Sequence, residues 1–310
     1  MGAERNPVKP LILEIRGNSL DDGPGIRSVV FFKGCPLSCA WCHNPEGKRI
    51  GPEIAFEDND CVGCNTCLAL CPEAALSRSN RYFIDRTRCS LCFKCADTCP
   101  SGALSRVGKA MTAGEIADIV MKDKPFYDTS GGGVTLSGGE PALFMDFTGE
   151  LLAGLKARGM HTLLETCGLF DMQKFQSALL PHLDAVYFDI KLIDEAAHRR
   201  FTGAGNERIL DNFRKLAHLT RGTSVMLLPR TPLIPGITDT DGNMEGIASF
   251  LTGIGIKRAA LMSYNPLWPA KARKIGVDEP LGREKAMTTW LDEASLERCR
   301  ASFIHAGIAL

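Results

Sequence analysis

Short apolar segments alternate with longer amphipathic segments along most of this 310-residue chain. Apolar and β-branched runs bounded by glycine, proline or charged residues predict buried strands, and apolar positions that recur every three or four residues predict helices. The predicted strands cover residues 11–15, 28–33, 134–137, 162–165, 185–190, 224–228 and 258–263. The predicted helices cover residues 112–122, 144–158, 172–180, 207–220, 244–252 and 291–307.

This order of repeated strand–helix units favours an α/β fold, in which helices cover a parallel sheet. Six of the strands belong to the core of that sheet, which is too few for a closed eight-stranded barrel. Polar residues follow the carboxyl ends of several strands, where ligand-binding loops of such folds lie. Taken singly, each is as well explained as an ordinary capping or surface residue. They are Glu165, Thr166, Asp189, Lys191, Arg230 and Asn265.

The segment between residues 51 and 108 differs because it holds two copies of one cysteine pattern. Each copy reads C-x2-C-x2-C-x3-C-P, the signature of bacterial ferredoxins with two 4Fe–4S clusters, in which the fourth cysteine of each copy ligates the other cluster. The alternative, a zinc ribbon, is disfavoured by the closing x3-C-P. The two predicted ligand sets are Cys61, Cys64, Cys67 and Cys99, and Cys89, Cys92, Cys95 and Cys71.

We therefore expect three parts along the chain. Residues 1–50 begin the α/β domain, residues 51–108 form a small insert that binds two clusters, and residues 109–310 complete the α/β domain. Because so small an insert has little apolar core, bound clusters would supply much of its folding free energy.

Overall charge gives no reason to expect binding to nucleic acid or to an anionic membrane, because acidic and basic residues balance at 36 each. No apolar run is long enough to cross a membrane, and the first residues lack the apolar segment of a signal peptide. The 13 cysteines lie mostly in short repeats, which favours metal ligation in a reducing cytoplasm over disulfides. Cys167 and Cys299 lie outside these repeats and are predicted to be small buried hydrophobic residues.

Three further cysteines, Cys35, Cys39 and Cys42, follow the strand at residues 28–33 with the spacing C-x3-C-x2-C. Three thiolates can hold three irons of a 4Fe–4S cube and leave the fourth iron without a protein ligand. Such an open position distinguishes a catalytic metal centre from a structural or electron-carrying one. Three incidental loop cysteines are the alternative, which the neighbouring motifs disfavour. We predict that these cysteines hold a catalytic cluster.

A glycine-rich segment follows one strand–helix unit after the cysteine loop. Gly138 and Gly139 allow the backbone to approach a ligand closely, and Glu140 can accept hydrogen bonds from an ammonium group. A Gly-Gly-Glu sequence is weak evidence alone, because glycine-rich turns more often serve backbone geometry. Its position after the three cysteines gives it weight.

Together these motifs resemble the radical S-adenosylmethionine superfamily. The flanking sequence resembles a narrower family, the activating enzymes of glycyl radical enzymes. The resemblance rests on DGPGIR at 22–27, FKGC at 32–35, WCHN at 41–44 and GGGVT at 131–135, and it extends from about residue 13 to about residue 305. It implies an open, partial (β/α)6 radical-SAM barrel that carries the ferredoxin-like insert.

The resemblance also implies roles for individual residues. In the family, S-adenosylmethionine lies against the cluster and the strand ends, and a monovalent cation lies near its carboxylate. The implied contacts to S-adenosylmethionine are Trp41, His43, Gly138, Gly139, Glu140, Asp189, Ile190, Lys191, Arg230 and Asn265. The implied cation ligands are Glu165, Thr166, Tyr187 and Asp189.

The family's reaction is the activity that the resemblance implies. One electron from the reduced cluster cleaves S-adenosylmethionine to methionine and a 5′-deoxyadenosyl radical, which removes hydrogen from a glycine Cα of a partner enzyme. Ferredoxin or flavodoxin would donate the electron, and the insert would relay it or help the partner to dock. The two extra clusters disfavour the short type that activates formate-lyase, but the partner's identity stays open.

Two other functions remain as alternatives. The first is another radical S-adenosylmethionine enzyme, acting on a small molecule or as a maturase, which the DGPGIR and GGGVT segments disfavour. The second is an electron-transfer iron–sulfur protein without catalysis. A carrier has no need of a three-cysteine open site beside a Gly-Gly-Glu-Pro segment.

Overall fold

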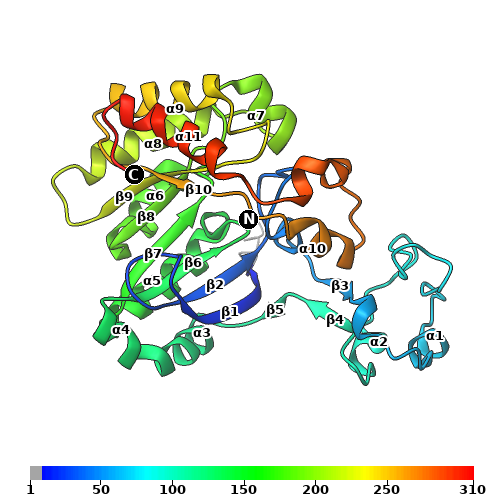
Figure 1. The fold of residues 1–310 in the computed structure, drawn as a ribbon. Coiled ribbons are helices and arrows are strands. Elements are labelled where there is room, and N and C mark those ends of the chain that lie inside the picture. The colour runs from blue at the N-terminus through cyan, green and yellow to red at the C-terminus, as the bar shows by residue number, and fades with distance from the viewer. Residues whose placement is uncertain (1–8) are drawn as a thin grey trace, which may run out of the picture.

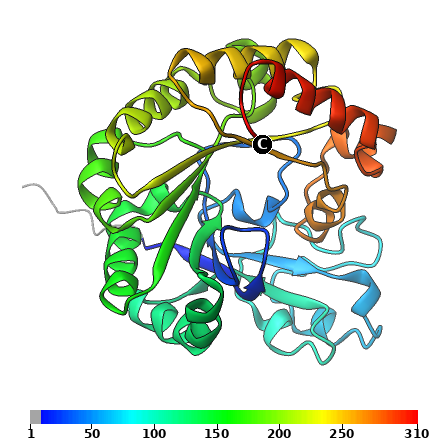
Figure 2. The same cartoon turned by 60° about the vertical axis from the view of Figure 1, so that its left-hand side comes forward.

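The computed structural model describes residues 9–310 and is built around one open sheet. Its strand order is β10-β9-β8-β7-β6-β2-β1-β5. The six strands from β10 to β2 are parallel, and β1 and β5 add antiparallel strands at one edge (Figures 1 and 2). The predicted α/β fold with a partly open sheet is thereby confirmed. The strands are β1 (Leu11–Ser19), β2 (Arg27–Lys33), β5 (Lys109–Ala110), β6 (Gly133–Gly138), β7 (His161–Thr166), β8 (Ala185–Asp189), β9 (Met226–Pro232) and β10 (Ala260–Met262).

Helices pack along the outer side of this sheet and enclose it in an arc (Figure 2). None of the described helices is long and apolar enough to cross a membrane. The cytoplasmic location of the protein stays a prediction. The helices that follow the parallel strands and close the fold are α3 (Ala113–Val120), α4 (Lys124–Ser130), α5 (Met145–Ala157), α6 (Met172–Ala178), α7 (Glu195–Thr202), α8 (Glu207–Thr220), α9 (Asp241–Gly253), α10 (Trp268–Lys274) and α11 (Glu293–His305).

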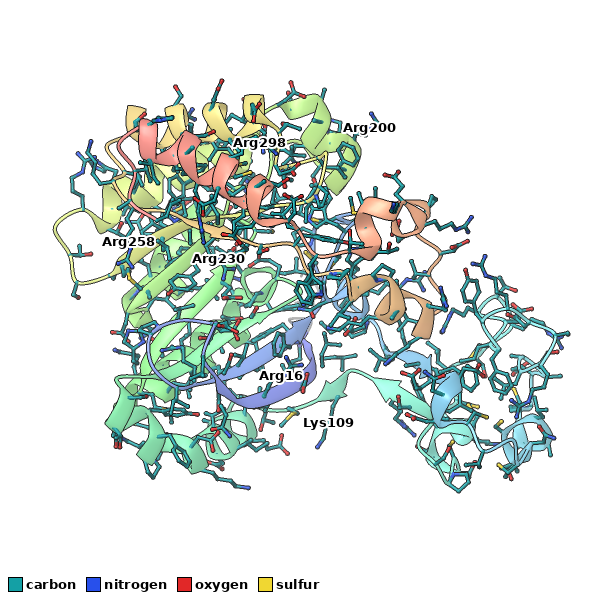
Figure 3. The ribbon with its side chains drawn as sticks, in the orientation of Figure 1. Arg16, Lys109, Arg200, Arg230, Arg258 and Arg298 are labelled. Atoms are coloured by element: carbon teal, nitrogen blue, oxygen red, sulfur yellow. The ribbon has the colours of Figure 1, made fainter. Side chains whose placement is uncertain are left out.

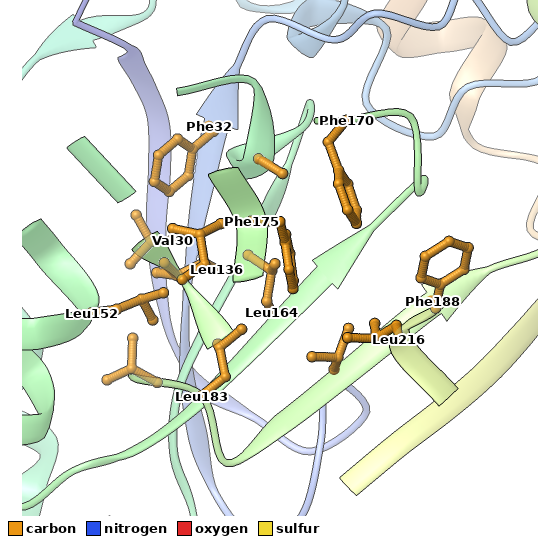
Figure 4. Packing of buried hydrophobic residues seen from close by; sticks show 14 of the residues in the cluster. Val30, Phe32, Leu136, Leu152, Leu164, Phe170, Phe175, Leu183, Phe188 and Leu216 are labelled. Carbon is orange, nitrogen blue, oxygen red and sulfur yellow. The ribbon is translucent and has the colours of Figure 1, made fainter. Parts of the chain in front are cut away.

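The main core lies between the sheet and these helices. Val30, Leu136 and Leu164 come from neighbouring strands, and all three side chains are fully buried. They pack against helix residues such as Leu152 and Leu216 (Figure 4). Strands that are buried on both faces read as nearly continuous apolar runs, as β2 does. This rigid layer fixes the positions of the loops at the carboxyl ends of the strands.

The structure corrects several predicted bounds. Helices α4, α7 and α10 were not predicted, since they bury few apolar side chains; α7, for example, buries only His198 and Thr202. The ninth strand runs four residues further than predicted, because Pro229 and Pro232 interrupt the apolar run without ending the strand. The helix predicted at residues 112–122 begins after Thr112, whose side chain forms a capping box with Glu115, but it ends at Val120 and continues as a 3-10 turn.

The cysteine-rich insert forms a separate body beside the sheet (Figure 1). The antiparallel pair of β3 (Glu53–Phe56) and β4 (Leu104–Val107) forms its base, and two short helices, α1 (Thr66–Leu70) and α2 (Lys94–Asp97), lie beyond it. Left-handed residues precede both helices, Asn65 with φ of 60° and Phe93 with φ of 61°. The two cysteine repeats therefore share their backbone geometry as well as their spacing.

Helix α10 and the residues after it join the insert to the rest of the chain (Figure 1). Arg86 donates to the carbonyl oxygens of Ile54 at 2.9 Å and of Lys274 at 3.2 Å. In the middle of this helix, Lys271 donates to the carbonyl oxygen of His43 at 3.1 Å. One helix thus contacts both the insert and the loop of Cys35, Cys39 and Cys42.

Candidate active site

The loop of Cys35, Cys39 and Cys42 begins where β2 ends and is fixed by backbone hydrogen bonds. The N–H of Ser38 donates to the Thr202 carbonyl at 2.7 Å, and that of Ala40 donates to the Phe201 carbonyl at 2.9 Å. The end of α7, although unpredicted, therefore holds the loop in place.

The three thiols lie in a mostly apolar environment. Cys39 is buried, and Cys35 and Cys42 are half-buried. Burial raises the pKa of the Cys39 thiol to about 12 and that of Cys42 to about 11. Because metals bind thiolates, metal binding at these sulfurs must release protons. The apolar residues packed around the loop include Leu37, Trp41, Tyr264 and Trp268.

The Gly-Gly-Glu segment lies directly against this loop. A Cβ atom at Gly139 would lie 2.3 Å from the carbonyl oxygen of Gly34 and 2.7 Å from that of Gly47, so only glycine fits. The next residue, Glu140, donates its N–H to the Gly34 carbonyl at 2.8 Å. The structure thus brings Glu140 beside the residue that precedes Cys35.

The side chain of Glu140 is fully buried and well hydrogen-bonded. It accepts from the N–H of Ala142 at 2.9 Å, the N–H of Cys167 at 2.6 Å and the hydroxyl of Thr166 at 3.0 Å. Burial raises the pKa of Glu140, while the hydrogen bonds from Cys167, Ala142 and Thr166 oppose that shift. Its position is therefore set by the ends of two neighbouring strands.

Charged residues at the next strand ends form one network. Arg230 forms ion pairs with Glu165 and with Asp189, and Lys191 donates to Asp189 at 2.9 Å. Burial alone would raise the pKa of Asp189, but Lys191 and Arg230 hold it below its usual value. Figure 3 shows Arg230 within the sheet domain. The predicted gathering of these polar residues at one edge of the sheet is found here.

The predicted monovalent-cation site coincides with this network. The Arg230 guanidinium lies between Glu165 and Asp189 and 5.2 Å from the ring centroid of Tyr187. Within residues 9–310, no group of three or more His, Cys, Asp or Glu side chains is placed to hold a metal ion. A cation there would require Arg230 to move, so the structure gives this site no support.

The other residues predicted to contact S-adenosylmethionine lie in different environments. Ile190 follows β8 and its side chain is buried in the main core, while its N–H donates to the Arg230 carbonyl at 2.9 Å. Trp41 is buried beside the cysteine loop. Burial, followed by the charge of Lys271, lowers the pKa of His43 to about 4, so its ring is neutral at pH 7. The half-buried Asn265 accepts from the N–H of Leu267 at 3.0 Å.

Two side chains at this site were not predicted to take part in it. The Cys167 thiol is buried, as expected, and its interaction with Cys35 lowers the pKa of the Cys35 thiol. Ser137 donates to Glu165 at 2.6 Å. Their positions at the ends of β7 and β6 were the available signal, because both follow apolar runs at the same edge of the sheet.

The insert holds two cavities lined by cysteines. The outer cavity lies at the Phe56 and Leu104 end of the β3–β4 pair. The inner cavity lies against Ile54, whose carbonyl shares Arg86 with Lys274 at the end of α10. Figure 3 shows the sulfur atoms gathered in this part of the chain. The outer cavity is lined by Cys61, Cys64, Cys67 and Cys99, and the inner cavity by Cys71, Cys89, Cys92 and Cys95.

The donor set and its arrangement fit an iron–sulfur cluster better than zinc. A zinc ribbon places paired C-x2-C knuckles around one ion, whereas each repeat here has three closely spaced cysteines and closes with x3-C-P. A 4Fe–4S cube instead takes its four thiolates at separate corners around a larger volume. The residues present therefore fit two such clusters.

Known proteins match this chain in sequence. The radical SAM superfamily model matches residues 79–245, and a 4Fe–4S single cluster domain matches residues 21–69. The choline trimethylamine-lyase activating enzyme of Oleidesulfovibrio alaskensis is 36% identical over 94% of each chain. The (2S)-3-sulfopropanediol sulfolyase activating enzyme of Bilophila wadsworthia is 40% identical over 93% of this chain and 94% of that one.

A solved structure shares the fold. The radical SAM methyltransferase from Sphaerobacter thermophilus covers 99% of this chain and 78% of its own, with a TM-score of 0.54 and 14% identity. The chain belongs to the radical SAM superfamily and, within it, to the activating enzymes of glycyl radical enzymes.

Proposed function

We propose that this protein activates a partner glycyl radical enzyme by reductive cleavage of S-adenosylmethionine. The single observation that carries the proposal is the contact between two motifs, the cysteine loop and Glu140, through the carbonyl of Gly34. A reduced 4Fe–4S cluster on Cys35, Cys39 and Cys42 would supply one electron. The products would be methionine and a 5′-deoxyadenosyl radical, which takes a hydrogen atom from a glycine Cα of the partner.

The chain's own residues would bind and orient the co-substrate. The backbone of Glu140 contacts the cysteine loop at Gly34, and its carboxylate would bind the amino group of the methionine moiety. Lys191 and Arg230 offer positive charge to the carboxylate of S-adenosylmethionine, while Asp189 holds both side chains in place. The neutral ring of His43 and the side chain of Asn265 complete the proposed contacts, together with the backbones of Gly138, Gly139, Trp41 and Ile190.

The insert would carry two further 4Fe–4S clusters, which makes three in the chain. The fit of the two cysteine-lined cavities supports this part of the proposal. We place one cluster on Cys61, Cys64, Cys67 and Cys99 and the other on Cys71, Cys89, Cys92 and Cys95. Because α10 contacts both the insert and the catalytic loop, we propose that electrons from ferredoxin or flavodoxin pass through the insert.

The proposal stops at the class of the partner. The relatives above are named for enzymes that act on choline and on a sulfonate, at similar identity to this chain. The benzylsuccinate synthase activating enzyme of Thauera aromatica is 42% identical over 78% of this chain. Similarity across such different partners gives no basis for choosing one.

The test is anaerobic reconstitution followed by reduction and addition of S-adenosylmethionine. We expect about twelve irons per chain, the sum of three 4Fe–4S clusters, and formation of 5′-deoxyadenosine. The variant Cys35→Ala/Cys39→Ala/Cys42→Ala should keep about eight irons and form none. A wild-type protein that loads all its iron but never cleaves S-adenosylmethionine, even with candidate partners present, would instead be an electron carrier.

A further inference from the structure

The two cavities of the insert differ in what their sulfur atoms contact. At the outer cavity, Arg78 places Nη1 and Nη2 each 3.5 Å from the Sγ of Cys61. The guanidinium is held there by Asn65, whose Oδ1 is 3.2 Å from Nη2, and by the ring of Phe83, whose centroid is 5.1 Å from Cζ. A full positive charge is therefore fixed against one ligand of this cavity.

The inner cavity has no equivalent contact. Its cysteines receive backbone N–H groups, such as that of Ala75, which donates to Cys71 at 3.3 Å. No charged side chain of the described residues donates to these sulfurs. Glu73 and Lys94 line the cavity with opposite charges.

Arg86 also lies on the inner side of the insert, but it is not equivalent to Arg78. Its N–H groups donate to the carbonyls of Ile54 and Lys274 instead of to sulfur. Its charge interacts first with the carboxylate of Glu53 and more weakly with Cys89, to which it makes no hydrogen bond. The asymmetry between the cavities therefore consists of one charged donor on the outer side.

Reduction adds one negative charge to an iron–sulfur cluster. Hydrogen bonds to the cluster's sulfurs and nearby positive charge stabilise that added charge and raise the reduction potential. We propose that Arg78 makes the outer cluster the more easily reduced of the two clusters in the insert. This inference rests on the proposed function, because it requires that both cavities hold clusters.

The first electron to enter the insert would therefore reside on the outer cluster. The outer cavity lies at the Phe56 end of β3, whereas the inner cavity lies against Ile54, next to Glu53, which pairs with Lys33 of the sheet domain. At intermediate reduction the electron would therefore reside away from the catalytic site. It would move inward only when a second electron arrives or when S-adenosylmethionine cleavage withdraws it.

The test is a redox titration of the reconstituted full-length protein followed by electron paramagnetic resonance. We compare the wild type with Arg78→Gln, which keeps donor N–H groups but removes the charge. The outer signal is assigned with Cys61→Ser, which replaces one ligand atom of that cluster. Arg81→Gln serves as the matched control, because Arg81 carries the same charge on the same insert but lines neither cavity.

In the wild type we expect the outer signal to form first. In Arg78→Gln its one-electron equilibrium constant should fall about tenfold, a shift of about 59 mV, while the inner signal and the iron content stay unchanged. An unchanged outer potential, or an equal shift from Arg81→Gln, would overturn the inference. A wild-type protein with only about four irons and no second or third signal would instead refute the proposed function of the insert.

Discussion

The catalytic loop and the insert both present cysteines for iron–sulfur clusters, but they are built on different physical foundations. The catalytic loop lies on a large apolar core, where its N–H groups donate to the carbonyls of Phe201 and Thr202 and glycines allow close contacts. The insert has a small core and two helices of four and five residues. We therefore expect the sheet domain to shape its cluster site before metal binds, and the insert to need bound clusters to hold its shape.

Removal of iron should separate the two regions most strongly. Chelation under anaerobic conditions should abolish amide-exchange protection in β3 and β4, because cluster binding supplies folding free energy to so small a core. The strands β6, β7 and β8 serve as the internal control and should keep their protection. Equal protection of β3 and β4 with and without iron would show that the insert folds without metal.

The variant Arg230→Gln tests the charged network of the sheet domain. It leaves Glu165 and Asp189 close together and buried without the arginine that pairs with both. The free energy of unfolding should therefore fall by about 3–5 kcal/mol at pH 7. Denaturant titration gives the value, and the matched control is Arg221→Gln, at an exposed position after α8.

The pH dependence of the stability difference between the wild type and Arg230→Gln gives an independent check. Because Lys191 and Arg230 hold the pKa of Asp189 below its usual value, its stabilising effect is present above the ordinary aspartate range and is lost on acidification. The deficit of Arg230→Gln should therefore shrink as the pH falls below about 4. A deficit that does not depend on pH would mean that packing, and not charge, explains the loss.

A smaller effect is expected from Gly139→Ala. The new methyl group would push apart the carbonyls of Gly34 and Gly47, with a cost of about 1–3 kcal/mol in unfolding free energy. Formation of 5′-deoxyadenosine should fall at least tenfold, because a rise of about 1.4 kcal/mol in the activation free energy lowers a rate by a factor of about ten.

The control for this variant is Gly154→Ala in α5, where the added methyl meets no atom within 4 Å. That change should stabilise the helix by up to about 1 kcal/mol and leave the activity unchanged. Equal stability and equal activity of the two alanine variants would show that the close approach of Gly139 to the two carbonyls does not matter.

The smallest effect is expected where the two regions meet in solvent. Arg81 pairs with Asp278 at 3.1 Å, and both side chains are largely exposed. Arg81→Ala should therefore change the free energy of unfolding by less than about 1 kcal/mol. A loss of several kcal/mol would mean that this pair, and not Arg86 and the clusters, attaches the insert.

Much of the fold was predictable because the strands are buried on both faces and their apolar runs are strong. The cysteine loop, Glu140 and the polar strand ends could also be placed, since parallel strands bring their carboxyl ends to one edge. Helix α7 could not be predicted, because its sequence is polar, yet its last residues hold the cysteine loop.

Contacts between distant segments lay beyond sequence reasoning. Side-chain packing in three dimensions brings Cys167 against Cys35. It also places Arg230 between Glu165 and Asp189. Arg78 likewise looks like an ordinary surface residue until Asn65 and Phe83 place it against Cys61. Spacing along the chain identifies ligands, whereas it does not identify the groups that tune them.

The most direct test of the account is transfer of a single hydrogen atom. A candidate glycyl radical enzyme is prepared with glycine deuterated at Cα and mixed anaerobically with the reduced protein and S-adenosylmethionine. We predict 5′-deoxyadenosine that contains one deuterium, together with a glycyl radical signal on the partner in electron paramagnetic resonance. Unlabelled 5′-deoxyadenosine and no glycyl radical with any candidate partner, despite efficient cleavage, would contradict the proposed activity.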